Sequence, residues 1–440
     1  MQTISKTELA STTELPRKRL LIDGQQVEPL SGRYFDVLNP ATGEIIAVVA
    51  EADAADIDRA VIAARKAFEG PWGRMRASDR GLVLQRFAQL LEDHAEELIA
   101  LESLDAGKPL AAVKRQDLPA AIDTLRYYAG WADKISGQVI STRPDALTYT
   151  VREPIGVVGA IVPWNFPLMI GMWKIAPALA CGCTVVLKPA EITPLSALRV
   201  GELALEAGLP PGALNIVPGH GRTAGRAIVD HPDIDKVTFT GSPNVGREIL
   251  AGAAGNLKRV TLELGGKSAN VIFGDADLDA ATKAAASGIF FNSGQVCSAG
   301  SRVLAHASVY DEVVERLTAR ARAIKVGDPR DAGVSMGPIV SQLQMKRVLD
   351  YIDIGTQEGA RVATGGEQIG DRGYFVAPTV FANVEHDMRI SQEEIFGPVV
   401  SVVRFDDEAD AIRKTNGTKY SLAAVCGARI SVGCSALPDR

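Results

Sequence analysis

The sequence predicts an α/β protein that contains a doubly wound parallel sheet, a second α/β unit and a separate β-hairpin. The first observation is an alternation of short apolar strands and helical segments between residues 156 and 264. The second is a further series of α/β segments from Leu278 onward. The third is residues 138–152, which are extended, rich in Thr, Val and Tyr, and turn at Pro144-Asp145. A chain of 440 residues is too long for one simple core, so two or three domains are expected.

The N-terminal part predicts short strands followed by helices. Leu20–Ile22 and Ile45–Ala50 are expected strands, and Asp23-Gly24 is a turn. From Ala55 to about Ala106 apolar residues recur at helical spacing with charges between them, and Asp117–Trp131 continues as helix. The hairpin that follows has to pair or pack elsewhere to be stable. An oligomer contact is the expected role, and packing over the chain's own body is the alternative.

Strands and helices then alternate in the order that a parallel sheet requires. Thr193-Pro194 predicts a helix N-cap with proline in the first turn, and Gly208 predicts the end of that helix. The expected strands are Gly156–Val162, Thr184–Leu187, Leu214–Val217, Lys236–Phe239 and Val260–Leu264, and the expected helices are Met169–Ala180, 195–207, Thr223–Val229 and 243–254.

Composition excludes several classes of function. The chain has 47 basic and 53 acidic residues, a formal charge of −6 and no basic stripe, so nucleic acid is not an expected partner. Five scattered cysteines, an odd number, fit a reducing compartment, and we expect a cytoplasmic protein. Cys181-Gly182-Cys183 lacks a second Cys/His pair at ligand spacing, so small packing residues are preferred to a metal site.

No membrane segment is expected. Residues 1–19 lack the apolar core of a signal peptide. The uncharged stretch Ile155–Trp173 is long enough to span a bilayer, but Pro163, Asn165 and Pro167 interrupt it. A buried strand followed by a turn is the better interpretation.

Cys297 is the first candidate for chemistry. It ends the run Phe290–Cys297, a Gly-containing loop after an apolar helix, and small residues follow it. A substrate can reach a thiol in such a loop, and a thiol becomes a nucleophile where the site favours the thiolate. Most intracellular cysteines are instead small buried hydrophobic residues, so other segments have to supply the rest of a site.

Two glycine-containing segments are candidates for a phosphate site. Thr240-Gly241-Ser242 follows a strand and precedes a helix that contains Gly246, where free N–H groups and the helix dipole favour an anion. The segment Gly219–Gly221 with Gly225 is closer to the dinucleotide fingerprint, but neither segment has its spacing. Each is an ordinary turn in the alternative interpretation.

Lys188 and Glu191 end a buried strand, where doubly wound sheets bind ligands. Their side chains can hold ribose hydroxyls, and the carboxylate would repel a 2′-phosphate, which favours NAD over NADP. A surface ion pair is the alternative.

Glu263 and Asn165 are candidates for acid–base and oxyanion chemistry. Glu263 lies near a strand end before two glycines, and partial desolvation there would raise its pKa and suit a general base. Asn165 lies between two prolines, so its amide is a rigid donor for a developing oxyanion. The alternatives are a solvated edge residue and a structural turn. The acidic Gln392–Pro398 segment could reach a ligand but indicates little alone.

Six segments occur in this order: Pro163–Pro167, Lys188–Glu191, Phe239–Ser242, Leu262–Lys267, Gly294–Cys297 and Glu393–Pro398. Together they resemble the NAD(P)-dependent aldehyde dehydrogenase superfamily from about Leu20 to about Ala424. Within it, Ile161–Ala180 is most similar to phenylacetaldehyde dehydrogenases. The resemblance implies a cofactor domain at residues 1–137 and 154–263, an oligomerisation hairpin at 138–153, a catalytic domain at 264–425 and an unmatched tail at 426–440.

The resemblance implies a role for each site residue. Cys297 would be the nucleophile, Glu263 the general base and Asn165 the oxyanion donor beside the Cys297 N–H. Phe166, Trp173 and Phe291 would line an apolar aldehyde tunnel. No metal is implied. The residues expected to bind NAD are Lys188 and Glu191 at the adenosine ribose, Gly241, Ser242 and Gly246 at the pyrophosphate, Glu394 and Phe396 at the nicotinamide ribose and ring, and Trp164, Gly221, Gly225 and Leu264.

The implied activity is NAD-dependent oxidation of an apolar or aromatic aldehyde to a carboxylic acid, through a thiohemiacetal and a thioester on cysteine. The alternatives are a non-catalytic chain that still binds NAD, a semialdehyde or betaine aldehyde dehydrogenase, and an acyl-CoA-forming enzyme. A poised base at Glu263 favours water over CoA. A homodimer or homotetramer is implied as well.

The C-terminal sequence departs from the family pattern. After Ala424 the resemblance ends, and a further core strand, a Gly-Gly loop and a terminal pairing strand are not visible. We therefore expect a C-terminally truncated member with an incomplete catalytic domain, an exposed apolar sheet edge and a weakened oligomer contact.

Overall fold

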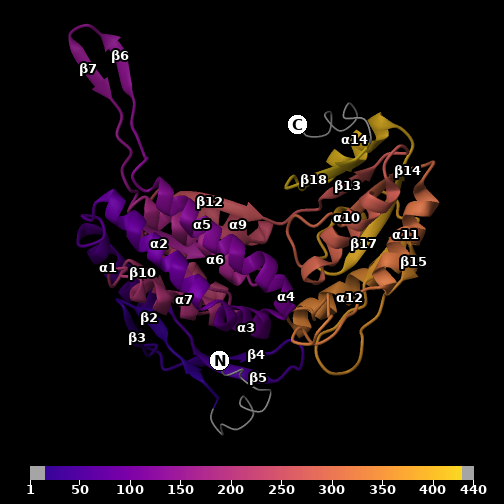
Figure 1. Ribbon diagram of the computed structural model, residues 1–440, viewed down its shortest axis with the longest axis horizontal. Helices are drawn as coiled ribbons and strands as arrows, with labels where there is room; N and C mark the ends of the chain where they lie inside the picture. The colour runs from indigo at the N-terminus through magenta and orange to yellow at the C-terminus, as the bar shows by residue number, and fades with distance from the viewer. Residues whose placement is uncertain (1–14, 429–440) are drawn as a thin grey trace.

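The computed structural model describes residues 15–428 and contains two large sheets that helices flank (Figure 1). The first sheet has seven strands in the order β12-β11-β8-β9-β10-β2-β3. The strands from β12 to β10 are parallel, whereas β2 and β3 are antiparallel at one edge. Their bounds are β2 Leu20–Ile22, β3 Gln25–Val27, β8 Val157–Ile161, β9 Thr184–Lys188, β10 Leu214–Ile216, β11 Lys236–Gly241 and β12 Arg259–Leu264. The predicted α/β fold with a doubly wound sheet is confirmed.

Two central strands, β8 and β9, are buried along their whole length. This is the burial that a near-continuous apolar run predicts for a parallel sheet covered on both faces. From β8 the chain adds β9 and β10 on one side and then β11 and β12 on the other. The order therefore reverses between β8 and β11, and such a switch point opens a crevice at the carboxyl ends of the strands.

Helices cover both faces of this sheet. Their bounds are α1 Ala54–Glu69, α2 Ala77–Asp93, α3 Ala95–Ala106, α4 Leu110–Ala112, η2 Val113–Asp117, α5 Leu118–Trp131, α6 Pro167–Ala180, α7 Leu195–Glu206, η3 Gly221–Gly225, α8 Arg226–Asp230 and α9 Pro243–Ala253. The prediction that Thr193 caps α7 was wrong, because its hydroxyl makes no hydrogen bond. The Asp105 carboxylate takes that place and accepts from the backbone N–H of Leu195 at 3.0 Å.

The second sheet has six strands in the order β15-β16-β17-β14-β13-β18. Its strands are β13 Ala269–Ile272, β14 Arg302–His306, β15 Arg361–Thr364, β16 Thr379–Ala382, β17 Val399–Phe405 and β18 Ala424–Gly427. The helices around it are α10 Leu278–Phe290, η4 Phe291–Gly294, α11 Tyr310–Arg322, α12 Gln342–Gln357, α13 Arg389–Gln392 and α14 Glu408–Asn416.

The expectation that no further core strand follows Ala424 was wrong. Strand β18 pairs in parallel with β13, from Ala269 opposite Ala424 to Ile272 opposite Gly427. The segment Ala424–Gly427 is short and lacks charge, so it can add to an open sheet edge without resembling the family in sequence. The rest of the predicted tail, from residue 429, lies outside the described residues.

The predicted hairpin is confirmed, with β6 Val139–Arg143 and β7 Ala146–Tyr149, and it projects far from the body (Figure 1). Val139 and Leu147 are each 76% exposed, so the hairpin does not pack over the chain's own body. A small sheet near the N-terminus, in the order β1-β5-β4, joins β1 Arg17–Lys18, β5 Ile45–Ala50 and β4 Tyr34–Leu38.

Within residues 15–428, no helix combines the length and apolar character needed to cross a bilayer. In the same residues, no group of three or more His, Cys, Asp or Glu side chains is arranged to hold a metal ion.

Candidate active site

A cavity of ≈160 Å³ lies between the two sheets and contains the Cys297 side chain. It opens at the carboxyl ends of β8, β11 and β12, at the switch point of the first sheet. Segments far apart in the sequence meet here because parallel strands end at the same sheet edge. Its lining residues are Pro163, Trp164, Asn165, Thr240, Gly241, Ser242, Leu264, Gly265, Cys297, Gln344, Arg347, Glu394 and Phe396.

Cys297 is half-buried in the loop that follows η4, so its thiol is open to the cavity. Before it, Asn292 and Ser293 have φ values of 49° and 55°, a left-handed backbone that non-glycine residues seldom adopt. Gln295 stabilises this turn, because its side-chain carbonyl accepts from the Val340 N–H at 3.0 Å. Strain of this kind is found mainly where surrounding contacts fix a functional loop.

The electrostatics of the protein groups around the cavity favour the neutral thiol. Burial raises the pKa of Cys297, and the carboxylates of Glu394 and Glu263 raise it further. The backbone N–H groups of Ser298 and Cys297 oppose this shift. A thiol in this state is protected until a bound cation or a hydrogen-bond donor stabilises the thiolate.

Asn165 is 4% exposed and lies beside the thiol loop. Its Nδ2 donates to the backbone oxygen of Gln295 at 2.9 Å. The Asn292 Nδ2 in turn donates to the backbone oxygen of Asn165 at 3.0 Å. These two bonds hold the amide in one orientation, as an oxyanion donor requires.

Glu263 is more exposed to solvent than the sequence predicted. It is exposed near the end of the edge strand β12, so the expected partial desolvation is absent. Its electrostatic neighbours are Cys297 and Lys174, a buried residue of α6 that donates to the Thr238 hydroxyl at 3.1 Å. Burial lowers the pKa of Lys174 to about 8, and Glu263 opposes that shift. Lys174 was not among the predicted site residues, although a lone charge in the apolar helix α6 was a signal.

Lys188 and Glu191 lie at the neighbouring strand end, after β9. The Lys188 Nζ donates to the carbonyl oxygen of Gly219 at 2.7 Å and to that of Pro189 at 2.8 Å, and it lies 3.4 Å from Glu191 Oε2. Burial lowers the pKa of Lys188. Burial would raise the pKa of Glu191, but the Lys188 ammonium and other groups bring it below the ordinary value. Glu191 is therefore a charged acceptor that is partly open to solvent.

The glycines after β10 lie beside this pair. Gly221 and Gly225 begin and end η3, and the structure offers no neighbouring atom within 4 Å of a Cβ built at Gly221. A Cβ at Gly225 would meet the Lys188 stem at 3.6 Å. These residues border Lys188 rather than the cavity that contains the thiol.

Gly241 and Ser242 line the cavity at the end of β11, and Gly246 does not. The Ser242 hydroxyl caps α9 and accepts from the Val245 N–H at 3.4 Å. A Cβ at Gly246 would meet Leu264 Cδ2 at 2.8 Å, so this glycine lets α9 approach β12 closely. Leu264 itself lines the cavity.

The side of the cavity across from Gly241 and Ser242 is formed by Glu394, Phe396 and Trp164. Glu394 Oε1 accepts from the Gly266 N–H at 3.1 Å, and burial raises the pKa of this carboxyl. The Phe396 ring meets the Trp164 ring edge to face at 5.2 Å, and its φ is 60°. A Cβ at Gly265 would lie 2.1 Å from the Glu394 carboxylate, so only glycine permits this approach.

The three predicted tunnel residues divide into two groups. Phe166 is 4% exposed and stacks with Phe291 at 6.2 Å, next to the thiol loop. Trp173 lies two turns further along α6, is 49% exposed, and lines a separate hollow of ≈380 Å³ with Asp123, Thr124, Tyr127 and Tyr128.

Gln344 and Arg347 line the cavity but were missed in the sequence. Both belong to α12, where Gln344 Nε2 donates to the Phe396 carbonyl at 2.9 Å and Arg347 Nη2 to the Glu394 carbonyl at 2.8 Å. Thr240 and Gly265 were part of recognised segments without an assigned role. The Q-x-x-R spacing, which places both side chains on one helix face, was the available signal.

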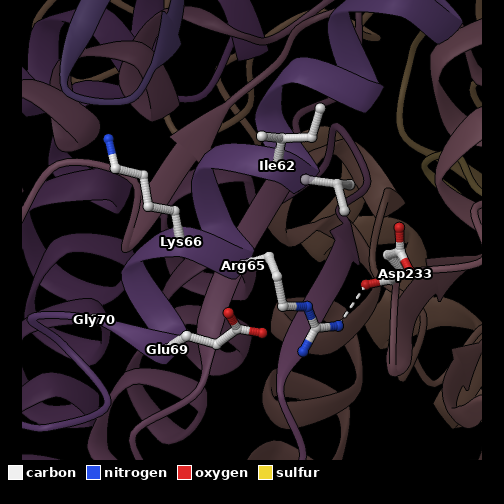
Figure 2. A pocket seen from close by; sticks show the side chains of 7 residues that line it. Ile62, Arg65, Lys66, Glu69, Gly70 and Asp233 are labelled. Atoms are coloured by element: carbon white, nitrogen blue, oxygen red, sulfur yellow. Dashed lines mark hydrogen bonds between the residues drawn. The ribbon is translucent and has the colours of Figure 1, made fainter.

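Another hollow lies on α1 and contains none of the predicted site residues. Figure 2 shows Arg65 at its centre, where Nη2 donates to the Asp233 carbonyl at 2.8 Å. The same guanidinium binds Asp235 at 2.6 Å. Its charge is thus largely committed to structural contacts.

Known proteins match nearly the whole chain. The model of the aldehyde dehydrogenase family matches residues 27–432, so the similarity continues past Ala424, where it was predicted to end. An aldehyde dehydrogenase of Emericella nidulans is 54% identical over 406 residues, 92% of this chain and 82% of the relative. The mitochondrial aldehyde dehydrogenase family 2 member B4 of Arabidopsis thaliana is 53% identical, over 94% of this chain and 77% of the relative.

Solved structures of aldehyde dehydrogenases have the same fold as this chain. The NAD+ complex of an aldehyde dehydrogenase from Bacillus cereus has a TM-score of 0.94 and 49% identity, over 97% of this chain and 87% of that one. An indole-3-acetaldehyde dehydrogenase complexed with NAD+ has a TM-score of 0.95 and 44% identity, over 99% and 89%. The chain therefore belongs to the aldehyde dehydrogenase family of oxidoreductases.

Proposed function

We propose that the protein oxidises an aldehyde to a carboxylic acid with NAD, and that Cys297 is the nucleophile. The observation that carries this proposal is one cavity that contains the half-buried Cys297 thiol, the fixed Asn165 amide and the Glu394 carboxylate. Solved relatives that bind NAD+ in the same fold support the choice of cofactor.

The residues of the cavity fit a dinucleotide along the carboxyl edge of the first sheet. Glu191 supplies a charged acceptor at one end and Glu394 a second at the other. Gly241 lies between them, at the end of β11 and just before the N-terminus of α9, where helix N–H groups favour a phosphate. Ser242 caps α9, and Trp164, Leu264 and Phe396 shape the apolar wall. Gly246 lets α9 approach Leu264 of that wall, and Gly221 and Gly225 lie at the two ends of η3 beside Lys188.

The reaction follows from these positions. The Cys297 thiolate attacks the aldehyde carbon to form a thiohemiacetal, and the Asn165 amide with the Cys297 N–H stabilises the oxyanion. When bound, NAD supplies the acceptor for the hydride that leaves this carbon. The resulting thioester is hydrolysed by a water from which Glu263 takes a proton, and this releases the acid and the thiol. The exposure of Glu263 favours this step, because water reaches it directly.

The substrate we propose is an apolar or aromatic aldehyde of the phenylacetaldehyde type. The stacked rings of Phe166 and Phe291 lie next to the thiol loop, and Trp173, Tyr127 and Tyr128 offer three further rings along α6 and α5. One solved relative is an indole-3-acetaldehyde dehydrogenase, which acts on an aldehyde attached to an aromatic ring by one carbon.

Asp123 favours a second candidate, an aldehyde with a cationic ammonium group. It is exposed beside three aromatic rings, a combination that attracts ammonium ions. Betaine aldehyde and its uncharged tert-butyl analogue have the same shape, so their relative kcat/KM measures the effect of charge. A preference for the charged aldehyde that Asp123→Asn abolishes would favour this candidate.

The test of the main proposal is NADH formation from phenylacetaldehyde and acetaldehyde. We expect activity with both, loss of activity in Cys297→Ala, and retained activity in Cys181→Ala, a matched thiol outside the cavity. Measured NAD binding without turnover of any aldehyde would instead favour the non-catalytic alternative. A dependence on CoA for release of the product would favour the acyl-CoA-forming enzyme.

We further propose that β6–β7 mediates assembly into a homodimer or homotetramer and that the enzyme is cytoplasmic. The exposed apolar side chains of Val139, Leu147 and Tyr149 support the first proposal. Cys181, Cys183 and Cys297 are free thiols, which supports a reducing compartment, whereas Cys426 is disulfide-bonded. Leu147→Asp should lower the mass measured by light scattering, and an unchanged mass would contradict the role of the hairpin. We also propose that the first large sheet belongs to a cofactor domain, that β6–β7 is the oligomerisation hairpin, and that the second large sheet belongs to a catalytic domain.

A further inference from the structure

Four ionisable side chains lie buried behind Phe166, and the mechanism above uses none of them. Glu102, Asp105, Lys108 and Asp117 are each at most 1% exposed. They come from α3, from the turn after it and from η2. The cluster thus contains three carboxyl groups and a single ammonium group, which acts on Glu102 and Asp117. Burial raises the pKa of all three carboxyls, which for Glu102 reaches about 7.

Lys108 makes two contacts at its ammonium group. Nζ pairs with the Asp117 carboxylate and lies 3.7 Å from the centre of the Phe166 ring. The turn that carries Lys108 is fixed as well, because the Ser103 hydroxyl donates to the Lys108 carbonyl at 2.6 Å. A desolvated cation at this distance from a ring face is strongly attracted to it.

Phe166 connects this cluster to the aldehyde site. It follows Asn165 in sequence, and its ring stacks with Phe291 at 6.2 Å and 25°. Phe291 begins the turn that leads to Cys297. A rotation of the Phe166 ring would therefore change the wall beside the thiol.

Glu102 fixes the residue on the other side of the ring. Its Oε1 accepts from the Leu168 N–H at 3.1 Å, and its Oε2 accepts from the Ser196 hydroxyl at 2.6 Å. The segment Asn165–Leu168 is thus held by Gln295 at its start, by Lys108 at the ring and by Glu102 at its end.

We propose that Lys108 is a positioning residue of the aldehyde site, which fixes the Phe166 ring through its ammonium group and thereby orients an aromatic substrate against the Cys297 thiol. This inference rests on the proposed function. It concerns the orientation of a ring, so it predicts selective effects on aromatic reagents, whereas a purely structural role for Lys108 predicts equal effects on all reagents.

Removing Lys108 alone would leave the Asp117 carboxylate buried without its partner and could unfold the protein. Two other changes avoid this. The first, Phe166→trifluorophenylalanine, withdraws charge from the ring face and leaves Lys108 and its ion pair in place. The second, Lys108→Met with Asp117→Asn, removes both charges together. The control is the same fluorination at Phe87, a buried ring of α2.

The measurement is the rate of Cys297 alkylation by phenacyl bromide relative to iodoacetamide, with the modified residue identified by peptide mapping. We expect fluorination at Phe166 to lower this ratio by about tenfold, the size of a desolvated cation–π contact. The double substitution should lower it similarly, and combining the two should add nothing further. The Phe87 control should leave the ratio unchanged.

A ratio that stays within about twofold after fluorination at Phe166, or effects that add fully when the two changes are combined, would overturn the inference. The labelling experiment needs no turnover. If the protein oxidises no aldehyde but the ratio falls as expected, the proposed function fails and the positioning role stands. If it oxidises phenylacetaldehyde but the ratio and the KM for that aldehyde do not change, only the positioning role fails.

Discussion

The side-chain amide of Asn165 donates a hydrogen bond to the backbone carbonyl of Gln295, 2.9 Å away, and so joins the loop after β8 to the loop that carries Cys297. The two residues are 130 positions apart in the chain. One N–H of the amide is used in this contact, and the second remains for the oxygen of a bound aldehyde. The proposed oxyanion donor and the proposed nucleophile are therefore fixed relative to one another before any substrate binds, which is the condition for electrostatic stabilisation at low reorganisation cost.

Asn165→Ala should lower kcat about 10²-fold, because one oxyanion donor is lost. The affinity for NAD should not change, since the amide is needed only when the aldehyde oxygen becomes negative. The measurement is kcat with phenylacetaldehyde beside NAD binding by fluorescence titration. Asn215→Ala is the control, because that buried amide donates to the Gly212 carbonyl at 2.8 Å, away from the cavity. A folded Asn165→Ala protein with normal kcat would contradict the assigned role.

When no cofactor is bound, the pKa of the Cys297 thiol should be higher than that of a free cysteine. Burial raises its pKa, with Glu394 and Glu263 acting in the same direction. Alkylation by iodoacetamide should therefore increase with pH through a midpoint above about 8.5, the value of an unperturbed thiol. NAD+ should lower this midpoint, because its nicotinamide ring is positively charged. A midpoint below that of a free thiol in the cofactor-free protein would exclude this description of the site.

Glu191 should control the choice between NAD and NADP. Its pKa is held below the ordinary value by Lys188 and neighbouring groups, so it is charged at neutral pH. Glu191→Ala should narrow the ratio of kcat/KM for NAD over NADP by roughly tenfold, since it removes repulsion of the 2′-phosphate. Glu202→Ala, at a surface glutamate paired with Arg199, is the control. An unchanged ratio would show that another residue determines the choice between NAD and NADP.

The sequence was most informative where the function depends on strand ends. Asn165, Lys188, Gly241 and Leu264 each follow or end an apolar strand, and parallel strands present their carboxyl ends at one edge, so their proximity could be expected. Phe396 and Cys297 lie in loops that precede β17 and β14 of the second sheet, and only the resemblance to a family assigned them to the same site.

Other features depend on contacts that local patterns do not contain. Asp105 caps a helix 90 positions away, and Lys108 meets Phe166 across the fold. Glu263 was expected to be desolvated because it lies near two glycines, but burial depends on what covers the β12 edge, which the strand's own residues do not specify. The short segment Ala424–Gly427 forms β18 because the edge of β13 is available, a tertiary effect that overrides its weak strand pattern.

Lys267→Met should stabilise the protein, and more strongly at neutral than at alkaline pH. Lys267 is 2% exposed, and its Nζ has no hydrogen-bond partner among residues 15–428. Burial and the nearby Arg302 lower its pKa to about 7. In the unfolded chain its pKa is about 10.4, so folding forces this lysine to release its proton between those values. The resulting cost, on the order of a few kcal/mol, is present below pH ~7 and disappears as the pH rises through ~10.4.

Replacement by methionine removes that cost without loss of volume, so the gain in the free energy of unfolding should shrink steadily as the pH is raised from neutral toward ~10.4. Urea titrations at several pH values measure this dependence. Lys258→Met is the matched control, because that buried ammonium group donates to the carbonyls of Val229 and His231 at 2.6 and 2.7 Å. Its replacement removes made hydrogen bonds and should destabilise the protein. A Lys267→Met variant that is less stable at neutral pH would contradict this prediction and show that the nearby carboxylates of Glu394 and Glu393, which oppose the pKa shift, compensate the charge of Lys267.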